Sequence, residues 1–329
     1  MIRTETFWKR YNSKTMKLII AIALALFCLT ATAQNQVVRR QGAKKPTTTS
    51  TTKKQSASTT TKKTSTTTKK TASANRGNKA KSSSSQSETL PRAAQQQISY
   101  QTFYANGVSF QMAKVVAGTF YMGATSEQQS PEGDETKHKV TLTKTYYLGK
   151  TEVTQALWQA VMGSNPSNFK GDNKPVECVS WNDCQEFISR LNAATGKNFR
   201  LPTEAEWEFA ARGGNNSRHY QYSGSNNLLD VAWYTDNSSN TTHDVASKQA
   251  NELGIYDMSG NVWEWCSDWY GSYSSNHQYD PAGATSGSYR VLRGGSWYHD
   301  ARYCRSSYRS NLDPDDRDRY IGLRLALSE

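Results

Sequence analysis

The chain has 329 residues and a formal net charge of +12, but its excess positive charge lies in the first 97 residues. Residues 34–97 hold fourteen Lys and Arg against one acid, whereas residues 98–329 hold twenty-one against twenty-six acids. Because the C-terminal part is mildly acidic, its composition argues against a nucleic-acid-binding domain. Its length is sufficient for one sizeable core in a single domain.

Residues 1–33 have the successive parts of a secretory signal. Lys17 is followed by an apolar run from Leu18 to Phe27, and small residues end the segment at Ala33. This order is typical of a signal peptide, and the apolar run is short for a membrane span. We expect a signal peptide over residues 1–33 and an exported protein that is periplasmic, at the cell surface or secreted. An uncleaved membrane anchor is the alternative.

Residues 34–97 form a low-complexity segment of Thr, Ser and paired lysines, without an aromatic residue. Such a segment cannot bury enough apolar surface to offset the entropy of ordering it. We expect a disordered linker before a folded domain over residues 98–329. The positive charge of the linker could contact an anionic envelope surface, although a solvated spacer is the simpler interpretation.

The folded part begins with short strands. The stretches 108–112, 118–123, 139–143 and 146–148 alternate in polarity or are rich in aromatic and β-branched residues, which predicts strands.

Three helices follow, each opened by a residue suited to capping. Thr154 precedes a helix that ends at Gly163, Ser180 opens a second, and Thr203 opens a third that ends at Gly213-Gly214. Between residues 214 and 254, frequent Asn, Ser, Thr and Gly predict loops. The sequence therefore predicts a loop-rich α+β fold in a single domain.

Four motifs occur in order along this domain: V-A-G-T-F-Y-M-G, L-P-T-E-A-E-W-E, G-N-V-W-E-W and I-G-L-R-L. Together they resemble the formylglycine-generating enzyme family, also called sulfatase-modifying factors. The resemblance implies a C-type-lectin-like fold elaborated with long loops. It also implies a chemistry, the oxidation of a cysteine in a Cys-x-Pro-x-Arg peptide of a sulfatase to formylglycine, with oxygen and with Cu(I) held by two thiolates.

One catalytic position departs from the family pattern. The family places its first cysteine three residues after Gly-Gly-Ser and its second cysteine five residues later. Here His299 occupies the first position and Cys304 the second. Because soft thiolates suit Cu(I), we expect a domain without oxidase activity. A copper-dependent oxidase that uses Cys304 with His299 is the alternative.

The segment D-M-S-G-N-V-W-E at residues 257–264 resembles the loop that binds calcium in the family. By resemblance the ligands would be the side chains of Asp257 and Glu264 with the backbone carbonyls of Gly260 and Val262. Oxygen atoms of these kinds are the ligands that calcium prefers, and the ion would be structural. The alternative is an aromatic turn in which Glu264 pairs with an arginine.

Three arginines of the C-terminal part, Arg293, Arg302 and Arg324, are candidates for ion pairs beneath the surface. We expect their partners among Glu204, Glu206 and Glu264.

Residues 298–327 contain no Lys, Glu, Gln, Met or Trp, five residues whose codons all end in A or G. Every residue that is present can be encoded by a codon ending in C. This usage resembles the variable proteins of diversity-generating retroelements, which have C-type-lectin-like folds and often a C-terminal variable segment. Tyr provides a large contact area at low entropy cost, and Ser, Asn and Asp provide adaptable polar contacts.

We therefore predict that the C-terminal segment forms a surface for an unknown protein or glycan ligand. The predicted contact residues are Tyr298, His299, Asp300, Tyr303, Ser310, Asn311, Leu312, Asp313, Asp316, Asp318, Arg319 and Tyr320. A solvated loop face is the simpler interpretation, and a structural component of an envelope assembly is the alternative function.

Overall fold

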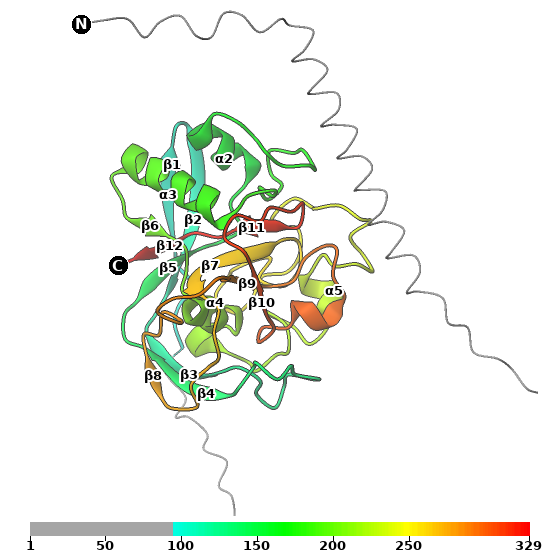
Figure 1. Cartoon of the computed structure of the whole chain (residues 1–329). Coiled ribbons are helices and arrows are strands. Elements are labelled where there is room, and N and C mark those ends of the chain that lie inside the picture. The colour runs from blue at the N-terminus through cyan, green and yellow to red at the C-terminus, as the bar shows by residue number, and fades with distance from the viewer. Residues whose placement is uncertain (1–94) are drawn as a thin grey trace, which may run out of the picture. The chain divides into compact units, whose positions relative to one another are not determined.

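The structure is a computed structural model that describes residues 95–329 (Figure 1). The predicted signal peptide and nearly all of the predicted linker lie outside the described residues. In the described part, no helix has the length and apolar character needed to cross a membrane.

The first sheet has five strands in which every neighbouring pair is antiparallel. In spatial order they are β1 (Tyr100–Ala105), β2 (Val108–Val115), β5 (Tyr146–Gly149), β12 (Ala326–Ser328) and β6 (Phe199–Arg200). The last strand of the chain is therefore fixed between two strands that precede it by more than a hundred residues.

The second sheet carries the C-terminal segment. In spatial order its strands are β10 (Arg309–Leu312), β9 (Arg290–Arg293), β7 (Trp263–Trp269) and β11 (Ile321–Leu323). The strands β10, β9 and β7 run antiparallel to their neighbours, whereas β11 is parallel to β7. A third, smaller sheet comprises β3 (Gly118–Met122), β4 (His138–Leu142) and β8 (Gln278–Tyr279).

The three longer helices of residues 95–329 are α2, α3 and α4. Figure 1 shows α2 (Gln155–Met162) and α3 (Trp181–Thr195) side by side against β1 and β2. Every residue of α4 (Glu204–Ala211) is buried. The remaining helical elements of residues 95–329 are one-turn pieces, namely η1 (Gly214–Asn216), α5 (Leu228–Val231) and η2 (Ala301–Cys304).

The capping residues act as the sequence predicts. Ser180 accepts a hydrogen bond from the backbone N–H of Asp183, whose carboxylate accepts one in return, and Thr203 and Glu206 form the same reciprocal box. The predicted strands and the helix after Thr154 are also confirmed. The third helix ends at Ala211, slightly before the predicted glycines, and the predicted loop region holds η1 and α5. The observed class is the predicted loop-rich α+β fold.

The apolar core has two main parts. One lies under α2 and α3 and includes Trp158, Phe187 and Trp265, with the rings of Trp158 and Phe187 stacked at 4.8 Å. The other surrounds α4 and includes Trp207 and Leu148. Both parts reach β7 or β9, so the sheet that carries the C-terminal segment rests on the core.

Candidate functional site

Five aromatic side chains of the C-terminal segment form a continuous cluster, which we call the aromatic face: Tyr298, His299, Tyr303, Tyr308 and Tyr320. The rings of Tyr298 and Tyr320 stack with centroids 5.8 Å apart and 9° between their planes. His299 meets both rings edge-on, at 5.6 and 5.2 Å. Tyr303 lies 5.1 Å from His299 and 4.8 Å from Tyr308, which continues the cluster.

The exposure of the aromatic face is uneven. Tyr298 is 53% exposed, whereas the other four rings are half-buried. Burial, together with a hydrogen bond to Asp318, raises the pKa of Tyr320 to about 12, so its hydroxyl is neutral. The face therefore offers contact area with little conformational freedom to lose when a ligand binds.

Two strands bring the separate parts of this face together. Tyr320 directly precedes β11, and the parallel pairing of β11 with β7 places the Tyr320 carbonyl 2.8 Å from the backbone nitrogen of Trp263. The Trp263 ring lies 5.5 Å from His299, 6.4 Å from Tyr303 and 6.1 Å from Tyr308. Because Trp263 is buried at the start of β7, it acts as a fixed base for these rings.

His299 is held as a packed side chain. The Trp263 Nε1–H donates to His299 Nδ1 at 3.2 Å, and the Ser296 hydroxyl lies 2.7 Å from the same nitrogen. Burial lowers the pKa of His299, and the nearby Asp300 and Asp318 offset only part of this effect. The imidazole is therefore neutral at neutral pH.

Charged residues border the aromatic face. Arg302 lies 3.4 Å from Asp300 and donates a hydrogen bond of 2.5 Å to the Tyr303 hydroxyl. Asp318 accepts a hydrogen bond from the backbone N–H of Arg319, whose guanidinium lies 5.5 Å from the centre of the Trp297 ring. Asp300, Arg302 and Arg319 are exposed, so this border is available for polar contacts.

The other predicted contact residues lie on a strand and on a turn. Ser310, Asn311 and Leu312 are half-buried on β10, and Leu312 packs against the core. Asp313 and Asp316 are exposed in a turn whose Arg317 binds Asp183 of α3 through two hydrogen bonds of 2.6 and 2.8 Å. Leu312 packs against the same part of the core as Tyr303, Tyr308 and Tyr320 of the aromatic face.

Tyr308 belongs to the aromatic face but is not among the contact residues predicted from the sequence. Its place inside the same Tyr-rich segment was the available signal, but the sequence does not reveal that its ring contacts Tyr303 and Trp263.

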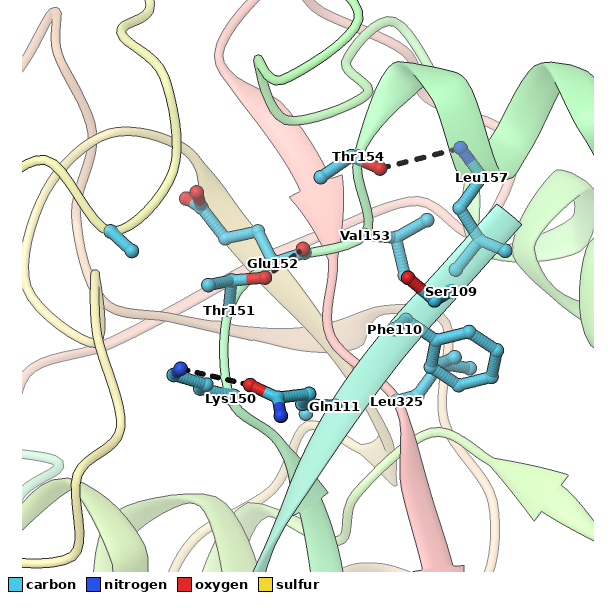
Figure 2. Close-up of a pocket in the computed structure, with 12 residues that line it drawn as sticks. Ser109, Phe110, Gln111, Lys150, Thr151, Glu152, Val153, Thr154, Leu157 and Leu325 are labelled. Carbon is cyan, nitrogen blue, oxygen red and sulfur yellow. Dashed lines mark hydrogen bonds between the residues drawn. The ribbon is translucent and has the colours of Figure 1, made fainter. Parts of the chain in front are cut away.

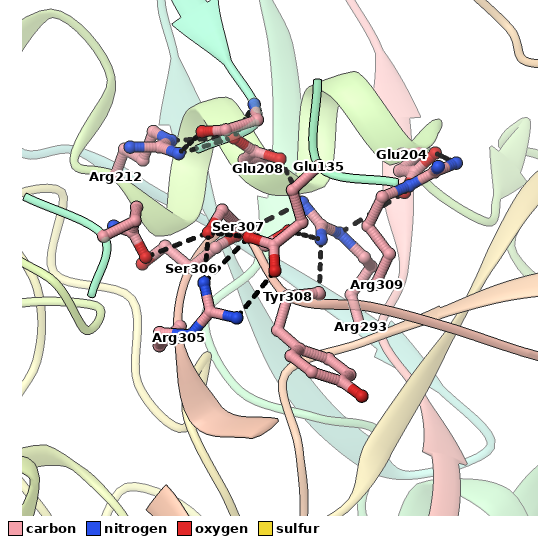
Figure 3. A network of polar contacts seen from close by, with 12 residues as sticks. Glu135, Glu204, Glu208, Arg212, Arg293, Arg305, Ser306, Ser307, Tyr308 and Arg309 are labelled. Atoms are coloured by element: carbon pink, nitrogen blue, oxygen red, sulfur yellow. Dashed lines mark hydrogen bonds and ion pairs between the residues drawn. The ribbon is translucent and has the colours of Figure 1, made fainter. Parts of the chain in front are cut away.

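Buried arginines anchor the segment from below (Figure 3). Arg305 binds Glu135 through two hydrogen bonds of 2.8 and 2.6 Å, and Arg309 binds Glu204 through two of 2.7 and 2.9 Å. All four side chains are buried. Paired and hydrogen-bonded charges of this kind define one geometry, because separating them would leave a charge buried alone.

The predicted ion pairs are partly confirmed. Arg324 binds Glu264, and Arg293 is buried against Glu208, with Glu204 farther away at 3.7 Å. The prediction for Arg302 is wrong, because its side chain is exposed beside Asp300. Glu206 instead binds Arg200, at 2.6 Å.

Cys304 is a packed thiol in the structure. It is fully buried among Tyr222, Val231 and Tyr234, and its sulfur lies 3.9 Å from the carbonyl oxygen of Asp300. Burial raises the pKa of the Cys304 thiol well above its usual range, which disfavours the thiolate that binds copper. Residues 95–329 contain no group of three His, Cys, Asp or Glu side chains suited to a metal ion. A buried, protonated thiol and an imidazole whose Nδ1 is hydrogen-bonded to Trp263 and Ser296 do not offer the two thiolates that hold Cu(I) in the family pattern.

The predicted calcium ligand Glu264 is already paired. Its two oxygens accept hydrogen bonds of 2.6 to 3.1 Å from Arg324, and one also accepts a hydrogen bond of 2.6 Å from Trp207 Nε1. The Asp257 carboxylate accepts from the backbone N–H of Ala246 at 2.7 Å. The backbone N–H of Val262 donates to Glu152 at 3.0 Å, and Gly260 is buried in the turn between Asp257 and Val262. As placed, both oxygens of Glu264 are engaged, so calcium binding at the loop expected by resemblance would require Arg324 to move away.

A cavity of about 300 Å³ lies between β2 and the segment 150–154. Figure 2 shows Lys150 and Gln111 on one side, joined by a hydrogen bond of 2.9 Å, and Phe110, Val153 and Leu157 on the other. None of the predicted site residues lines this cavity. The Lys150 amine of the lining already donates a hydrogen bond to Gln111, so the lining of this cavity does not identify a class of ligand.

The chain is similar in sequence and in structure to known proteins. Residues 101–329 match the family model described as the sulfatase-modifying factor enzyme 1-like domain. A chaperone protein LppX of Paenibacillus barcinonensis is 36% identical over 234 residues, which are 56% of this chain and 80% of that protein. A formylglycine-generating enzyme of Streptomyces coelicolor is 36% identical over 192 residues, but the match covers only 59% of the enzyme and 53% of this chain.

Among solved structures, variable protein 1 of Treponema denticola has a TM-score of 0.64 and 35% sequence identity. The match covers 70% of this chain and 99% of that protein. It includes nearly all of the described residues, so the similarity concerns the whole fold and not a single motif.

Proposed function

Because the chain belongs to the sulfatase-modifying factor enzyme 1-like family, we propose that it keeps the family's C-type-lectin-like fold and uses it to bind a ligand without oxidising one. The observation that carries this proposal is the aromatic face, in which Tyr298 and Tyr320 stack beside the neutral His299. An exposed Tyr298 beside half-buried tyrosines on a fixed base, bordered by Asp and Arg, has the chemistry of a recognition surface.

The environments of Cys304 and His299 argue against the oxidase alternative. Two thiolates hold Cu(I) in the family enzymes, whereas the corresponding positions here are the buried, protonated thiol of Cys304 and the imidazole of His299, which is hydrogen-bonded to Trp263 and Ser296. The Streptomyces enzyme is similar to the chain over little more than half its length, so the similarity alone does not carry its activity to this protein.

The ligand class is an unknown protein or glycan. The similarity to a Treponema variable protein supports the proposal that residues 298–320 are a diversified segment whose exposed side chains set specificity. The similarity to a protein named a chaperone also agrees with a binding role. We further propose that the protein is exported, on the basis of the signal-like residues 1–33.

The test is a binding screen with matched tyrosine variants. The purified chain is screened against immobilised panels of extracellular proteins and of glycans, and each ligand is measured again with Tyr298→Ala and Tyr320→Ala. Tyr104→Ala is the control, because Tyr104 is 70% exposed on β1 and outside the aromatic face. We expect both face variants to weaken binding about tenfold or more and the control to leave it unchanged. If all three variants bound the ligand as tightly as the unchanged chain, the ligand site would lie outside the aromatic face.

A further inference from the structure

The strand β1 lies at the edge of the first sheet. Among residues 95–329 it has a neighbouring strand on one side only, which is β2. Three of its residues carry exposed side chains: Tyr100 is 39% exposed, Tyr104 is 70% exposed, and Thr102 between them is also exposed. No residue of the aromatic face belongs to β1 or β2, so this edge is independent of the function proposed above.

The hydrogen bonds of the sheet show which main-chain groups of β1 reach its free edge. The backbone N–H of Lys114 donates to the Ser99 carbonyl at 3.0 Å, so these two residues form a hydrogen-bonded pair. Such pairs alternate with non-hydrogen-bonded pairs along an antiparallel ladder. The N–H and C=O groups of Tyr100, Thr102 and Tyr104 therefore point away from β2, toward the side on which the described residues provide no strand.

The strand β2 agrees with this pattern. Gln111 of β2 lies opposite Thr102, and its carbonyl accepts a hydrogen bond of 2.9 Å from the backbone N–H of Lys150, which follows β5. Gln111 therefore directs its carbonyl away from β1, as expected for a pair that is not hydrogen-bonded. Thr102 likewise directs its N–H and C=O to the free edge.

The edge lacks the features that keep edge strands unpaired. Natural edge strands are commonly protected by charged residues, by Pro or by a bulge. Residues 95–113, which include β1 and most of β2, contain no charged residue and no Pro. The pairing of β1 with β2 runs through six consecutive residue pairs without a register shift. The strand β1 is therefore regular and suited to pairing with a further strand.

The chain enters β1 from the end of the strand. The main chain of Gln96 is hydrogen-bonded to the side chain of Asn216, at 2.8 and 2.9 Å. The side chain of Gln96 is hydrogen-bonded to the backbone of Lys114 and Val116, at 2.7 and 2.9 Å. These contacts keep residues 96–99 beside β2, so they do not cover the free edge of β1.

The sequence of β1 is complementary to itself. If two copies pair antiparallel with Thr102 opposite Thr102, Tyr100 of each copy lies opposite the partner's Tyr104. The same three residues carry the outward main-chain groups, so each pair can exchange two hydrogen bonds. Aromatic pairs and Thr–Thr pairs are both favourable across strands, and β1 has no charge that would oppose the approach. The Tyr100 ring is already held in place, because its hydroxyl donates to the Gly254 carbonyl at 2.9 Å.

We propose that the protein forms a two-fold symmetric dimer in which the β1 strands of two copies pair antiparallel, with Thr102 at the symmetry axis. A two-fold interface requires a surface that is complementary to itself, and β1 meets this requirement in its main-chain pattern and in its side chains. The pairing joins the five-stranded sheets of two copies into one continuous sheet. Main-chain hydrogen bonds supply the affinity in strand addition.

The experiment is sedimentation velocity of the full chain over a range of protein concentrations. We expect a reversible dimer with a Kd on the order of 10–100 μM, because an interface built mainly on one strand from each copy is small. In a binding screen run below this concentration the chain is monomeric, so the Tyr104→Ala control of that screen stays valid.

Thr102→Lys tests the pairing with a charge. It places two ammonium groups opposite each other at the symmetry axis, and should raise the dimer Kd about tenfold or more. Ser109→Lys is the matched control, because Ser109 is exposed on the same face of the sheet but lies on β2, one strand away from the free edge. It should leave the dimer Kd nearly unchanged, and thermal unfolding checks that both variants fold.

Thr102→Cys tests the register. Antiparallel partners that exchange hydrogen bonds have Cα atoms about 5.5 Å apart, a separation that a disulfide can bridge. Under mild oxidation above the dimer Kd, the Thr102→Cys chains should be linked at least about tenfold faster than the Ser109→Cys chains. Non-reducing gel electrophoresis measures the linked fraction, and the five native cysteines are the same in both variants.

Three results would overturn the proposal. A chain that stays monomeric well above about 100 μM would show that the edge is solvated or covered by another part of the same chain. Equal dimerisation by Thr102→Lys and Ser109→Lys would place the contact between copies elsewhere. Equally fast disulfide linking of the two cysteine variants would remove Thr102 from the symmetry axis.

Discussion

The indole N–H of Trp263 donates a hydrogen bond of 3.2 Å to His299 Nδ1. This contact ties the residue that replaces the family's first thiol to the start of β7, and it turns a catalytic position into part of a packed aromatic surface. Cys304, five residues later, is buried in a separate cluster. The two positions that make copper chemistry in the family thus have different structural roles here.

The first prediction concerns this hydrogen bond. Trp263→Phe keeps an aromatic base but removes the indole donor, and should lower the free energy of unfolding by about 1–3 kcal/mol. Urea denaturation followed by circular dichroism measures the change. Trp233→Phe is the control, because the Trp233 N–H donates to Ser247 in an exposed contact. Equal losses in the two variants would show that the bond to His299 contributes nothing specific.

The second prediction concerns the anchor beneath the C-terminal segment. Glu135→Gln leaves Arg305 buried without its counter-charge, and should cost about 3–5 kcal/mol in unfolding free energy. Glu186→Gln removes the exposed partner of Arg190 and should cost at most about 1 kcal/mol. If Glu135→Gln proved as mild as the control in urea denaturation, the segment would not depend on this ion pair.

The third prediction is a pH dependence. The folded-state pKa of Asp268 is about 7, above the value of about 3.9 for an unperturbed Asp. The protonated form is therefore favoured in the folded state, and this contribution is fully present below about pH 4 and is lost as the pH rises to about 7. Asp268→Asn removes the effect.

Thermal unfolding across this pH range compares the two proteins. The variant should gain stability relative to the wild type as the pH rises, by up to about 4 kcal/mol from the size of the shift. The other buried acids titrate in both proteins, so the difference isolates Asp268. A difference that does not change with pH would contradict the raised pKa.

The fourth prediction concerns calcium. Because Arg324 neutralises Glu264, adding calcium chloride or a chelator should shift the Tm by no more than about 1 °C, as expected for an ion that binds the folded state weakly. Differential scanning fluorimetry is sufficient. A calcium-dependent rise of several degrees that Asp257→Asn abolishes would establish the calcium loop and require Arg324 to move.

Local signals in the sequence determined much of the fold. Ser180 and Thr203 predict helix starts because a side-chain cap depends on residues within one turn. The third helix ends before Gly213 because Arg212, at φ −76° and ψ 0°, already leaves the helical conformation as its C-cap. The helix α5 has four residues and is too short to leave a periodic pattern.

The candidate site was predictable only in part. Tyrosines crowded into one segment indicated a surface, but the contact between Tyr298 and Tyr320 depends on β11 pairing with the distant β7. The charge of a residue in the sequence does not identify its ion-pair partner or its burial. The sequence predicts that both Arg293 and Arg302 are buried; this is confirmed for Arg293, whereas Arg302 is exposed. The burial of Asp268 gave no signal in the sequence, because it depends on the end of β7 lying against the start of α4, where Asp268 accepts a hydrogen bond from the backbone N–H of Glu204.

The most direct test of the account is oxygen-dependent turnover of a Cys-x-Pro-x-Arg peptide by the full chain supplied with Cu(I), followed by mass spectrometry. Cys304→Ala is the control for background oxidation. A binding domain with a packed Cys304 should yield no more formylglycine than this control. Formylglycine produced above the Cys304→Ala level, and dependent on His299, would contradict the account and make these two residues a copper site.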